Sequence, residues 1–330
     1  MGEGPNMKKS KLRIASLFSG CGGMDLGAEG GFSYLDKKYF RLRTKIVFST
    51  DFDQAISTIY NDNFANHLVV ENIRAINSDS IPEHDILTGG FPCQSFSVVA
   101  QNPIRLGYKD EKGRLFFEMC RILKEKKPAV FVAENVKGIL SANKGKAFPL
   151  IIKEFENSGY FVKHAILNAA HFGIPQKRER VFIVGFRKDS QFTSFSFPEP
   201  TTRMCPVPLS KVILPLSEVP QKYFFSERAV AGMKNTKHSK SMNKGRAQSL
   251  DQPCNTVGAH LAKVSLNSTD PVIKIGQRYR MFTPREVARI QSFPENFRLN
   301  ASQSTNYRAL GNAVPPVLMW HVMRSVLKSL

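Results

Sequence analysis

Short apolar runs alternate along the chain with polar segments that contain glycine. Several runs have the length of strands, and continuous apolar character is typical of strands that helices cover on both faces. The expected strands are 12–18, 45–50, 67–70, 84–88, 129–133, 160–168 and 181–186. Helical spacing and capping signals predict helices after the glycine-rich turn at 19–27, over 113–127 and 144–158, from Thr283, and over 315–330. The alternation predicts an α/β fold with a mixed, mostly parallel sheet and helices on both of its faces.

The pattern changes after Phe186. Six prolines fall between Gln191 and Pro220, and little periodicity follows up to about Ile275. Proline interrupts both helices and strands, so we expect a linker that enters a second, smaller domain of short strands and loops. A helix start is then clear at Thr283-Pro284-Arg285-Glu286, where the sequence has the cap, the first-turn proline and the glutamate of a capping box.

The charge balance favours a polyanionic partner. The chain has 47 Lys and Arg against 27 Asp and Glu, a net charge of +20. Nucleic acid is the commonest such partner, although a lysine-rich source organism would give the same total. The distribution favours nucleic acid, because residues 221–280 contain 11 Lys or Arg and only three acids.

The five cysteines are an odd number without a C-x-x-C pair. This argues against a disulfide framework and a zinc site, and for a reducing compartment. No run of 18 apolar residues predicts a membrane helix, and the first residues are polar and basic, unlike a secretory signal. We therefore expect a cytoplasmic protein without a metal and without a membrane partner, with residues 1–10 as a flexible leader.

Glycine and polar residues follow the first three expected strands. The turn at 19–27 opens a helix, and such a turn lets a nucleotide-like cofactor lie against backbone N–H groups. Asp51 is placed to bond ribose hydroxyls, Phe52 could stack on adenine, and Asn72 could meet the adenine edge. The glycine pattern alone is a weak signal, since it fits a dinucleotide, S-adenosylmethionine or a simple tight turn.

The fourth strand leads into Thr88-Gly89-Gly90-Phe91-Pro92-Cys93-Gln94-Ser95-Phe96-Ser97. Its end is the edge at which open α/β sheets bind ligands. A lone cysteine is usually a small hydrophobic residue, but these neighbours favour a nucleophile at Cys93. The fifth strand brings Glu134 to the same edge, where a salt-bridge partner is the plainer alternative. The cations of Gln176–Arg180 could bind phosphate or a base oxygen, or belong to a solvated loop.

Together these motifs identify a family. Phe-Pro-Cys-Gln, Glu-Asn-Val, Gln-Lys-Arg-Glu-Arg and, near the end, Gly-Asn-Ala-Val occur in an order that resembles the C5-cytosine DNA methyltransferases. The resemblance covers residues 12–190 and 278–330. It implies a Rossmann-like S-adenosylmethionine-dependent methyltransferase domain and methyl transfer to C5 of a cytosine flipped out of duplex DNA. The products would be 5-methylcytosine and S-adenosyl-L-homocysteine, and no metal is required.

The resemblance also implies residue roles. Cys93 would add to the cytosine C6 and make C5 nucleophilic. Glu134 would hold N3 and the exocyclic amine, Arg180 would bind O2, and Arg178 would orient the site and the DNA backbone. The cofactor pocket would comprise Phe18, Gly20, Cys21, Gly22, Gly23, Asp51, Phe52, Asn72, Ile73, Pro92, Leu115, Asn312 and Val314. Asn72 replaces the aspartate common in the family, so the hydrogen bond to the adenine amine should be weaker.

Contacts with DNA are expected from two sources. Gln94 and Ser97 match family positions that touch DNA. Arg228, Arg246, Gln248 and His260 are candidate base readers on chemistry alone, because Arg and Gln can pair with guanine and adenine edges.

The resemblance implies a catalytic and cofactor-binding domain of residues 11–190 and 300–330, and a target-recognition domain with its hinge at 191–299. We expect a bacterial modification enzyme, a monomer, with double-stranded DNA as its partner and a restriction endonuclease acting on the same site. The alternatives are a tRNA methyltransferase of the same family and an inactive DNA-binding relative. The first lacks support because there is no Cys-Phe-Thr motif, and the second because Cys93, Glu134 and Arg180 are all present. A Rossmann dehydrogenase would leave those three residues unexplained.

Overall fold

A seven-stranded sheet forms the centre of the protein. The computed structural model describes residues 10–92, 114–190, 192, 194–235, 246–263 and 270–330. In sheet order the strands are β5 (Val69–Val70), β4 (Thr44–Asp51), β1 (Leu12–Leu17), β6 (Ile86–Gly89), β7 (Val130–Val136), β10 (Glu179–Arg187) and β8 (Tyr160–Asn168). The first five are parallel, and β10 runs antiparallel to both of its neighbours. The predicted mixed, mostly parallel α/β sheet is confirmed.

The register brings four strand ends to one edge. Leu17 at the end of β1 lies opposite Thr50 of β4 on one side and Gly89 of β6 on the other. Gly89 in turn lies opposite Ala133 of β7, immediately before Glu134. The segments that follow β1, β4, β6 and β7 therefore emerge side by side, as expected for a ligand-binding edge of a parallel sheet.

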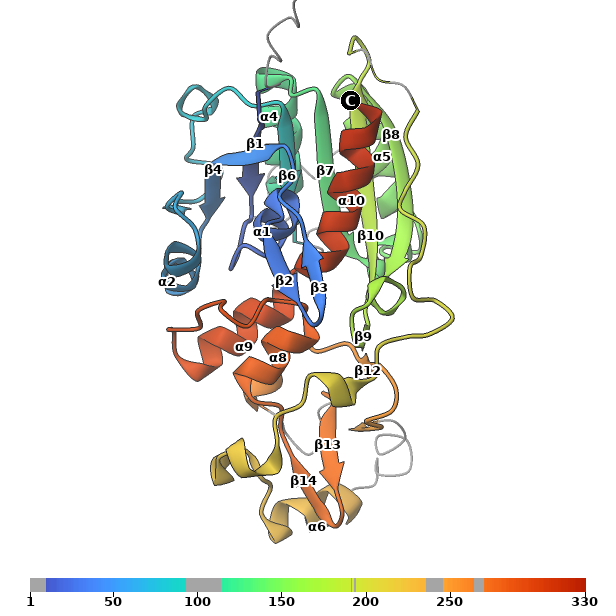
Figure 1. Cartoon of the computed structure of the whole chain (residues 1–330). Helices are drawn as coiled ribbons and strands as arrows, with labels where there is room; N and C mark the ends of the chain where they lie inside the picture. Colours follow the sequence, from blue (N-terminus) through green and yellow to red (C-terminus); the bar gives the residue numbers. More distant parts are fainter. Residues whose placement is uncertain (1–9, 93–113, 191, 193, 236–245, 264–269) are drawn as a thin grey trace, which may run out of the picture.

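Helices cover both faces of this sheet (Figure 1). On one face α1 (Gly23–Glu29) and α10 (Pro316–Ser329) pack in an apolar cluster with Ile14, Ile86 and Val132. On the other face α4 (Arg114–Lys126) and α5 (Ala147–Asn157) pack against Leu87 and Phe131. Side chains alternate between faces along a strand, so successive residues of β6 enter different clusters. The two-sided burial explains why these strands are continuously apolar.

The remaining elements lie mostly beyond the carboxyl edge of the sheet (Figure 1). A short sheet contains β11 (Ala247–Gln248), β13 (Val272–Ile275) and β14 (Arg278–Arg280), while β12 (Cys254–Asn255) pairs with β9 (Gln176–Lys177). The helices here are α2 (Gln54–Asn63), α6 (Glu227–Asn235), α8 (Pro284–Ile290) and α9 (Gln303–Asn312). The predicted capping box of Thr283 and Glu286 is present at the start of α8.

Two features were not expected from the sequence. A hairpin of β2 (Phe32–Tyr34) and β3 (Lys37–Tyr39) packs on α10, with the Tyr39 ring 5.2 Å from that of Trp320. A third apolar cluster joins Ile56 and Ile59 of α2 to α8 and α9.

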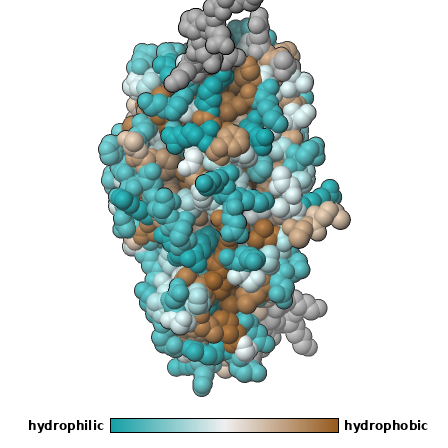
Figure 2. All heavy atoms as spheres, in the orientation of Figure 1, coloured by the Kyte–Doolittle hydropathy of each residue, from teal (hydrophilic) through white to brown (hydrophobic). Residues whose placement is uncertain are grey.

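The face seen in Figure 2 is largely hydrophilic, with hydrophobic residues gathered in a band over its lower half. Among the described residues, no helix combines the length and apolar character needed to cross a membrane.

Candidate active site

An ion pair between two neighbouring strands lies at the carboxyl edge of the sheet. Nε of Arg180, near the start of β10, is 3.0 Å from Oε1 of Glu134 on β7, and each side chain is 11% exposed. Burial raises the pKa of the Glu134 carboxyl above its usual value, while Arg180 and Arg178 oppose that shift. Two residues that lie 46 positions apart in sequence are thus paired by the antiparallel register of β7 and β10.

This pair borders the segment that leads to Cys93. The Asn135 side-chain amide donates to the Phe91 carbonyl oxygen at 2.9 Å and fixes that segment to β7. Gly90 lies next to the carboxylate, since a side-chain carbon built there would be in ordinary van der Waals contact with Oε2 of Glu134, at 3.5 Å. Pro92 is partly buried beside them. Cys93, Gln94 and Ser97 lie outside the described residues.

The glycine-rich turn after β1 is held beside the end of β4. The Gly20 N–H donates to Oδ2 of Asp51 at 2.9 Å, and the Asp53 N–H donates to Oδ1 at 3.0 Å. Gly22 has φ of 85°, in the left-handed region. At Gly23 a side-chain carbon would lie 2.3 Å from the Val314 carbonyl oxygen, so only glycine lets α1 begin against this segment. The turn, Asp51 and Val314 are therefore brought together.

The remaining predicted cofactor residues lie around the same edge with different exposure. Phe52, directly after β4, is 73% exposed, an unusual position for a phenylalanine ring. Asn72 is exposed and its Oδ1 accepts from the Arg74 N–H at 3.2 Å, while Ile73 is buried. Phe18 and Leu115 are partly buried, Cys21 is buried, and Asn312 is exposed at the end of α9.

Comparison with known proteins agrees with this geometry. A family model described as C-5 cytosine-specific DNA methylase matches residues 12–328. The chain is 34% identical to the type II methyltransferase M.Bsp6I of Bacillus sp. (strain RFL6), over 97% of this chain and 99% of the relative. It is 36% identical to M.NgoFVII of Neisseria gonorrhoeae, over 98% of this chain and 88% of the relative.

The chain belongs to the C-5 cytosine-specific DNA methylase family. This membership confirms the predicted enzyme class, a DNA cytosine-C5 methyltransferase. Two solved structures share the fold at a TM-score of 0.74: the methyltransferase EhMeth of Entamoeba histolytica, 18% identical, and a DNMT2 variant of Spodoptera frugiperda, 20% identical. The match to EhMeth covers 97% of this chain and 99% of EhMeth, and the match to the DNMT2 variant covers 96% of this chain and 100% of the variant.

Arg178 has a different position in the enzyme from the one expected. Its side chain is 1% exposed, and its guanidinium donates to the carbonyl oxygens of Val257, Gly311 and Ala313 at 2.9–3.1 Å. Burial, with help from Arg180, lowers its pKa well below the usual value. These nitrogens donate to protein carbonyl oxygens, so Arg178 can orient the site only through the protein backbone, and its effect on the DNA backbone stays a prediction. Arg178 instead joins the segment after β12 to both residues that flank Asn312.

Two of the four candidate base readers are also internal. The Arg246 guanidinium donates to the Asp270 carbonyl oxygen at 2.9 Å, and Gln248 both donates to the Arg246 carbonyl oxygen and accepts from the Asn255 N–H. Both side chains are buried, which argues against the prediction that they read bases in DNA. Their polar groups form hydrogen bonds with the backbone around β11 and β12. Arg228 on α6 and His260 are exposed and stay candidates.

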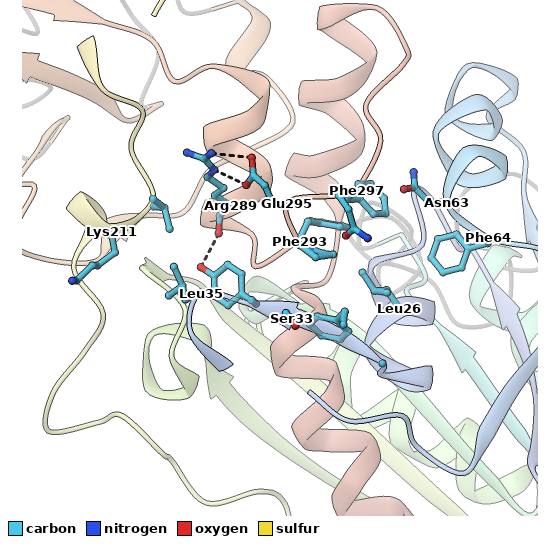
Figure 3. A pocket seen from close by; sticks show the side chains of 16 residues that line it. Leu26, Ser33, Leu35, Asn63, Phe64, Lys211, Arg289, Phe293, Glu295 and Phe297 are labelled. Carbon is cyan, nitrogen blue, oxygen red and sulfur yellow. Dashed lines mark hydrogen bonds and ion pairs between the residues drawn. The ribbon is translucent and has the colours of Figure 1, made fainter. Parts of the chain in front are cut away.

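A cavity of about 800 Å³ lies between the β2–β3 hairpin, the end of α2 and the segment that follows α8 (Figure 3). Leu26, Phe64, Phe293 and Phe297 line it, with the Arg289–Glu295 ion pair at 2.8 Å on one side. Of the predicted catalytic and cofactor residues that lie in the described ranges, none lines it.

Sequence reasoning missed one polar side chain close to the turn. Asp25, on the first turn of α1, is 0% exposed and accepts hydrogen bonds from Ser16 and Tyr60. The sequence signal that could have indicated its burial is its position directly after Gly22-Gly23-Met24, where the first turn of a helix must pack on the sheet. In the sequence alone, an acid at this position looks the same as one on the solvated face of a helix.

Proposed function

We propose that this enzyme transfers a methyl group from S-adenosylmethionine to C5 of a cytosine that is flipped out of a short, specific duplex sequence. The observation that carries the proposal is the buried Glu134–Arg180 pair, 3.0 Å apart, directly beside Gly90 and the segment that ends in Pro92. An acid and a guanidinium at this edge can hold the N3 and O2 edge of cytosine. Cys93, the next residue in the chain, then supplies the nucleophile.

The proposed reaction consists of addition to C6, methyl transfer to C5, and loss of the C5 proton with release of the thiolate. The Cys93 thiolate adds to C6 of the cytosine, and the ring gains electron density that Glu134 stabilises at N3 with its proton. C5 is now nucleophilic and would accept the methyl group, while the bond from that methyl group to the sulfonium sulfur of the cofactor would break and leave S-adenosyl-L-homocysteine. Loss of the C5 proton to a base re-forms the C5–C6 double bond and breaks the S–C6 bond, which releases the Cys93 thiolate, and the proton on N3 returns to Glu134. The raised pKa of Glu134 keeps its proton available closer to neutral pH.

The residues near the glycine turn fit S-adenosylmethionine. The exposed Phe52 ring offers a stacking surface for adenine, and the Asp51 carboxylate lies at the Gly20 backbone, where a ribose would approach. When bound, the cofactor supplies the electrophilic methyl group on its sulfonium. Asn72 offers an amide in place of a carboxylate, so the adenine amine would be held by a neutral acceptor. Pro92, Leu115, Asn312 and Val314 would close the pocket.

Target recognition is assigned to residues 191–299. This segment contains the basic stretch 221–280, whose 11 Lys or Arg suit the phosphates of double-stranded DNA. The exposed Arg228 and His260 are the base-reading candidates that remain. The relatives named as type II methyltransferases support a role as the modification enzyme of a bacterial restriction–modification system. We propose that the enzyme acts in the cytoplasm as a monomer, beside an endonuclease of the same specificity.

Bisulfite sequencing tests the proposed activity. Purified enzyme is incubated with S-adenosylmethionine and a mixed duplex pool, and protected cytosines are mapped. Protection at one short repeated sequence is expected. Label from the cofactor in a tRNA pool, without protection of DNA, would replace the proposal by RNA methylation. Absence of transfer to either pool would show an inactive relative.

A further inference from the structure

We propose that Asp25 is a positioning residue that holds the glycine-rich turn in the shape that binds the cofactor. The inference rests on the proposed use of S-adenosylmethionine at this turn. Asp25 itself cannot touch a ligand, because its side chain is 0% exposed beneath the start of α1. Any effect on the cofactor must therefore pass through the groups that Asp25 holds.

One branch of hydrogen bonds leads from Asp25 to the start of the turn. Ser16 of β1 donates to Oδ1 of Asp25 at 2.5 Å, and the Ser19 hydroxyl lies 2.9 Å from the Ser16 hydroxyl. Ser19 is also tied through its backbone, since its N–H donates to the Thr50 carbonyl oxygen and its carbonyl oxygen accepts from the Gly22 N–H. The carboxylate thus fixes the residue at which the chain leaves the sheet.

A second branch reaches the other end of the turn. Tyr60 of α2 donates to Oδ2 of Asp25 at 2.6 Å, and its ring stacks on Phe64 with the centroids 4.4 Å apart. The Phe64 ring fills the space beside Gly22, where a side-chain carbon would lie 2.2 Å from the ring. Asp25 therefore holds, through Tyr60 and Phe64, the wall against which Gly22 is placed.

A carboxylate is suited to this task because each of its oxygens is a strong acceptor in a dry environment. Among the described residues no cation pairs with Asp25, so its burial is offset by the hydroxyls of Ser16, Tyr60 and, at 3.4 Å, Ser49. An uncompensated buried charge is costly. A helix that only had to pack on the sheet would be served better by an apolar residue.

The test compares Asp25→Asn with Asp36→Asn, which removes the same charge from an exposed position on the β2–β3 turn. An amide has the shape of the carboxylate, but in either orientation it replaces one of the two bonded oxygens by a donor. We expect the KM and the Kd for S-adenosylmethionine to rise about tenfold in Asp25→Asn, with kcat at saturating cofactor within about twofold of the parent. Asp36→Asn should match the parent in all three.

Tyr60→Phe provides a second variant that keeps the ring on Phe64 and removes one donor. It should raise the cofactor KM by a smaller factor, and the two substitutions should not be additive because they break one network. Ile151→Val, in the cluster on the opposite face of the sheet, gives a stability control: it should lower Tm without moving the KM. Unchanged cofactor affinity in Asp25→Asn, or an equal rise in Ile151→Val, would overturn the inference. Failure of the parent enzyme to bind the cofactor would instead refute the proposed function on which it rests.

Discussion

Nε of Arg180 lies 3.0 Å from Oε1 of Glu134, and this pair joins the antiparallel strand β10 to the last parallel strand of the sheet. The arrangement gives the guanidinium two roles. It limits the rise in the pKa of Glu134 that burial causes, and it leaves a cation beside a protonatable acid at the edge where a base would enter. Asn135 then fixes the segment before Cys93 by donating a hydrogen bond to the Phe91 carbonyl oxygen.

Replacing Glu134 by Gln should lower kcat by about 10²- to 10⁴-fold, because the amide keeps the hydrogen-bonding shape but has no proton to transfer. Cofactor binding should be unchanged, since Glu134 lies outside the glycine turn. Single-turnover methylation and equilibrium binding measure the two effects. A variant with the parental rate would remove Glu134 from the mechanism.

Arg178→Gln should destabilise the enzyme by about 2 to 4 kcal/mol, because the carbonyl oxygens of Val257, Gly311 and Ala313 would lose a buried donor. Denaturant unfolding measures this change. The matched control is Arg308→Gln, which breaks a half-exposed ion pair with Asp53 and should cost less than about 1 kcal/mol. Equal losses in the two variants would contradict the structural role of Arg178.

The stability contributed by Asp25 should depend on pH. Burial raises the pKa of its carboxyl from 3.8 to about 6, against the hydrogen bonds of Ser16, Tyr60 and Ser49, and Glu29 adds to the rise. The folded state therefore holds a proton that the unfolded state has lost, and the free energy of unfolding falls as pH rises from about 4 to about 6.

Asp25→Asn removes this titration. The difference in unfolding free energy between the parent and this variant should change by roughly 2 to 3 kcal/mol across that pH window and stay level above it. Urea unfolding of both proteins at several pH values measures the difference. A difference that does not change with pH would mean that Asp25 stays ionised throughout.

Arg228→Ala should reduce the dependence of DNA affinity on salt by about one unit of the logarithmic slope, if the exposed guanidinium neutralises one phosphate. Lys328→Ala, exposed near the end of α10, should leave the slope at the parental value. Titrations at several salt concentrations check both. A parental salt slope with weaker binding to the target sequence would assign Arg228 to a base instead of a phosphate, and parental affinity with a parental slope would place the DNA elsewhere.

Much of the fold and site could be predicted because the informative residues are local. Asp51 and Glu134 lie at or near the carboxyl ends of recognisable strands, and neighbouring parallel strands bring such groups to one edge. The hairpin at Phe32–Tyr39 was missed because its strands are only three residues long. Arg178, Arg246 and Asp25 could not be placed, because a polar residue satisfied by distant backbone or hydroxyl groups has no signature in its own neighbourhood.

The central claim is tested most directly by a duplex pool in which 5-fluorocytosine replaces cytosine. Fluorine at C5 cannot leave as a proton does, so the last step stops after methyl transfer. In the presence of S-adenosylmethionine we expect a denaturation-resistant enzyme–DNA complex, with the base attached to the peptide that contains Cys93, and no complex with Cys93→Ser. A complex at another residue, or methylation of ordinary DNA without any trapped complex, would contradict it.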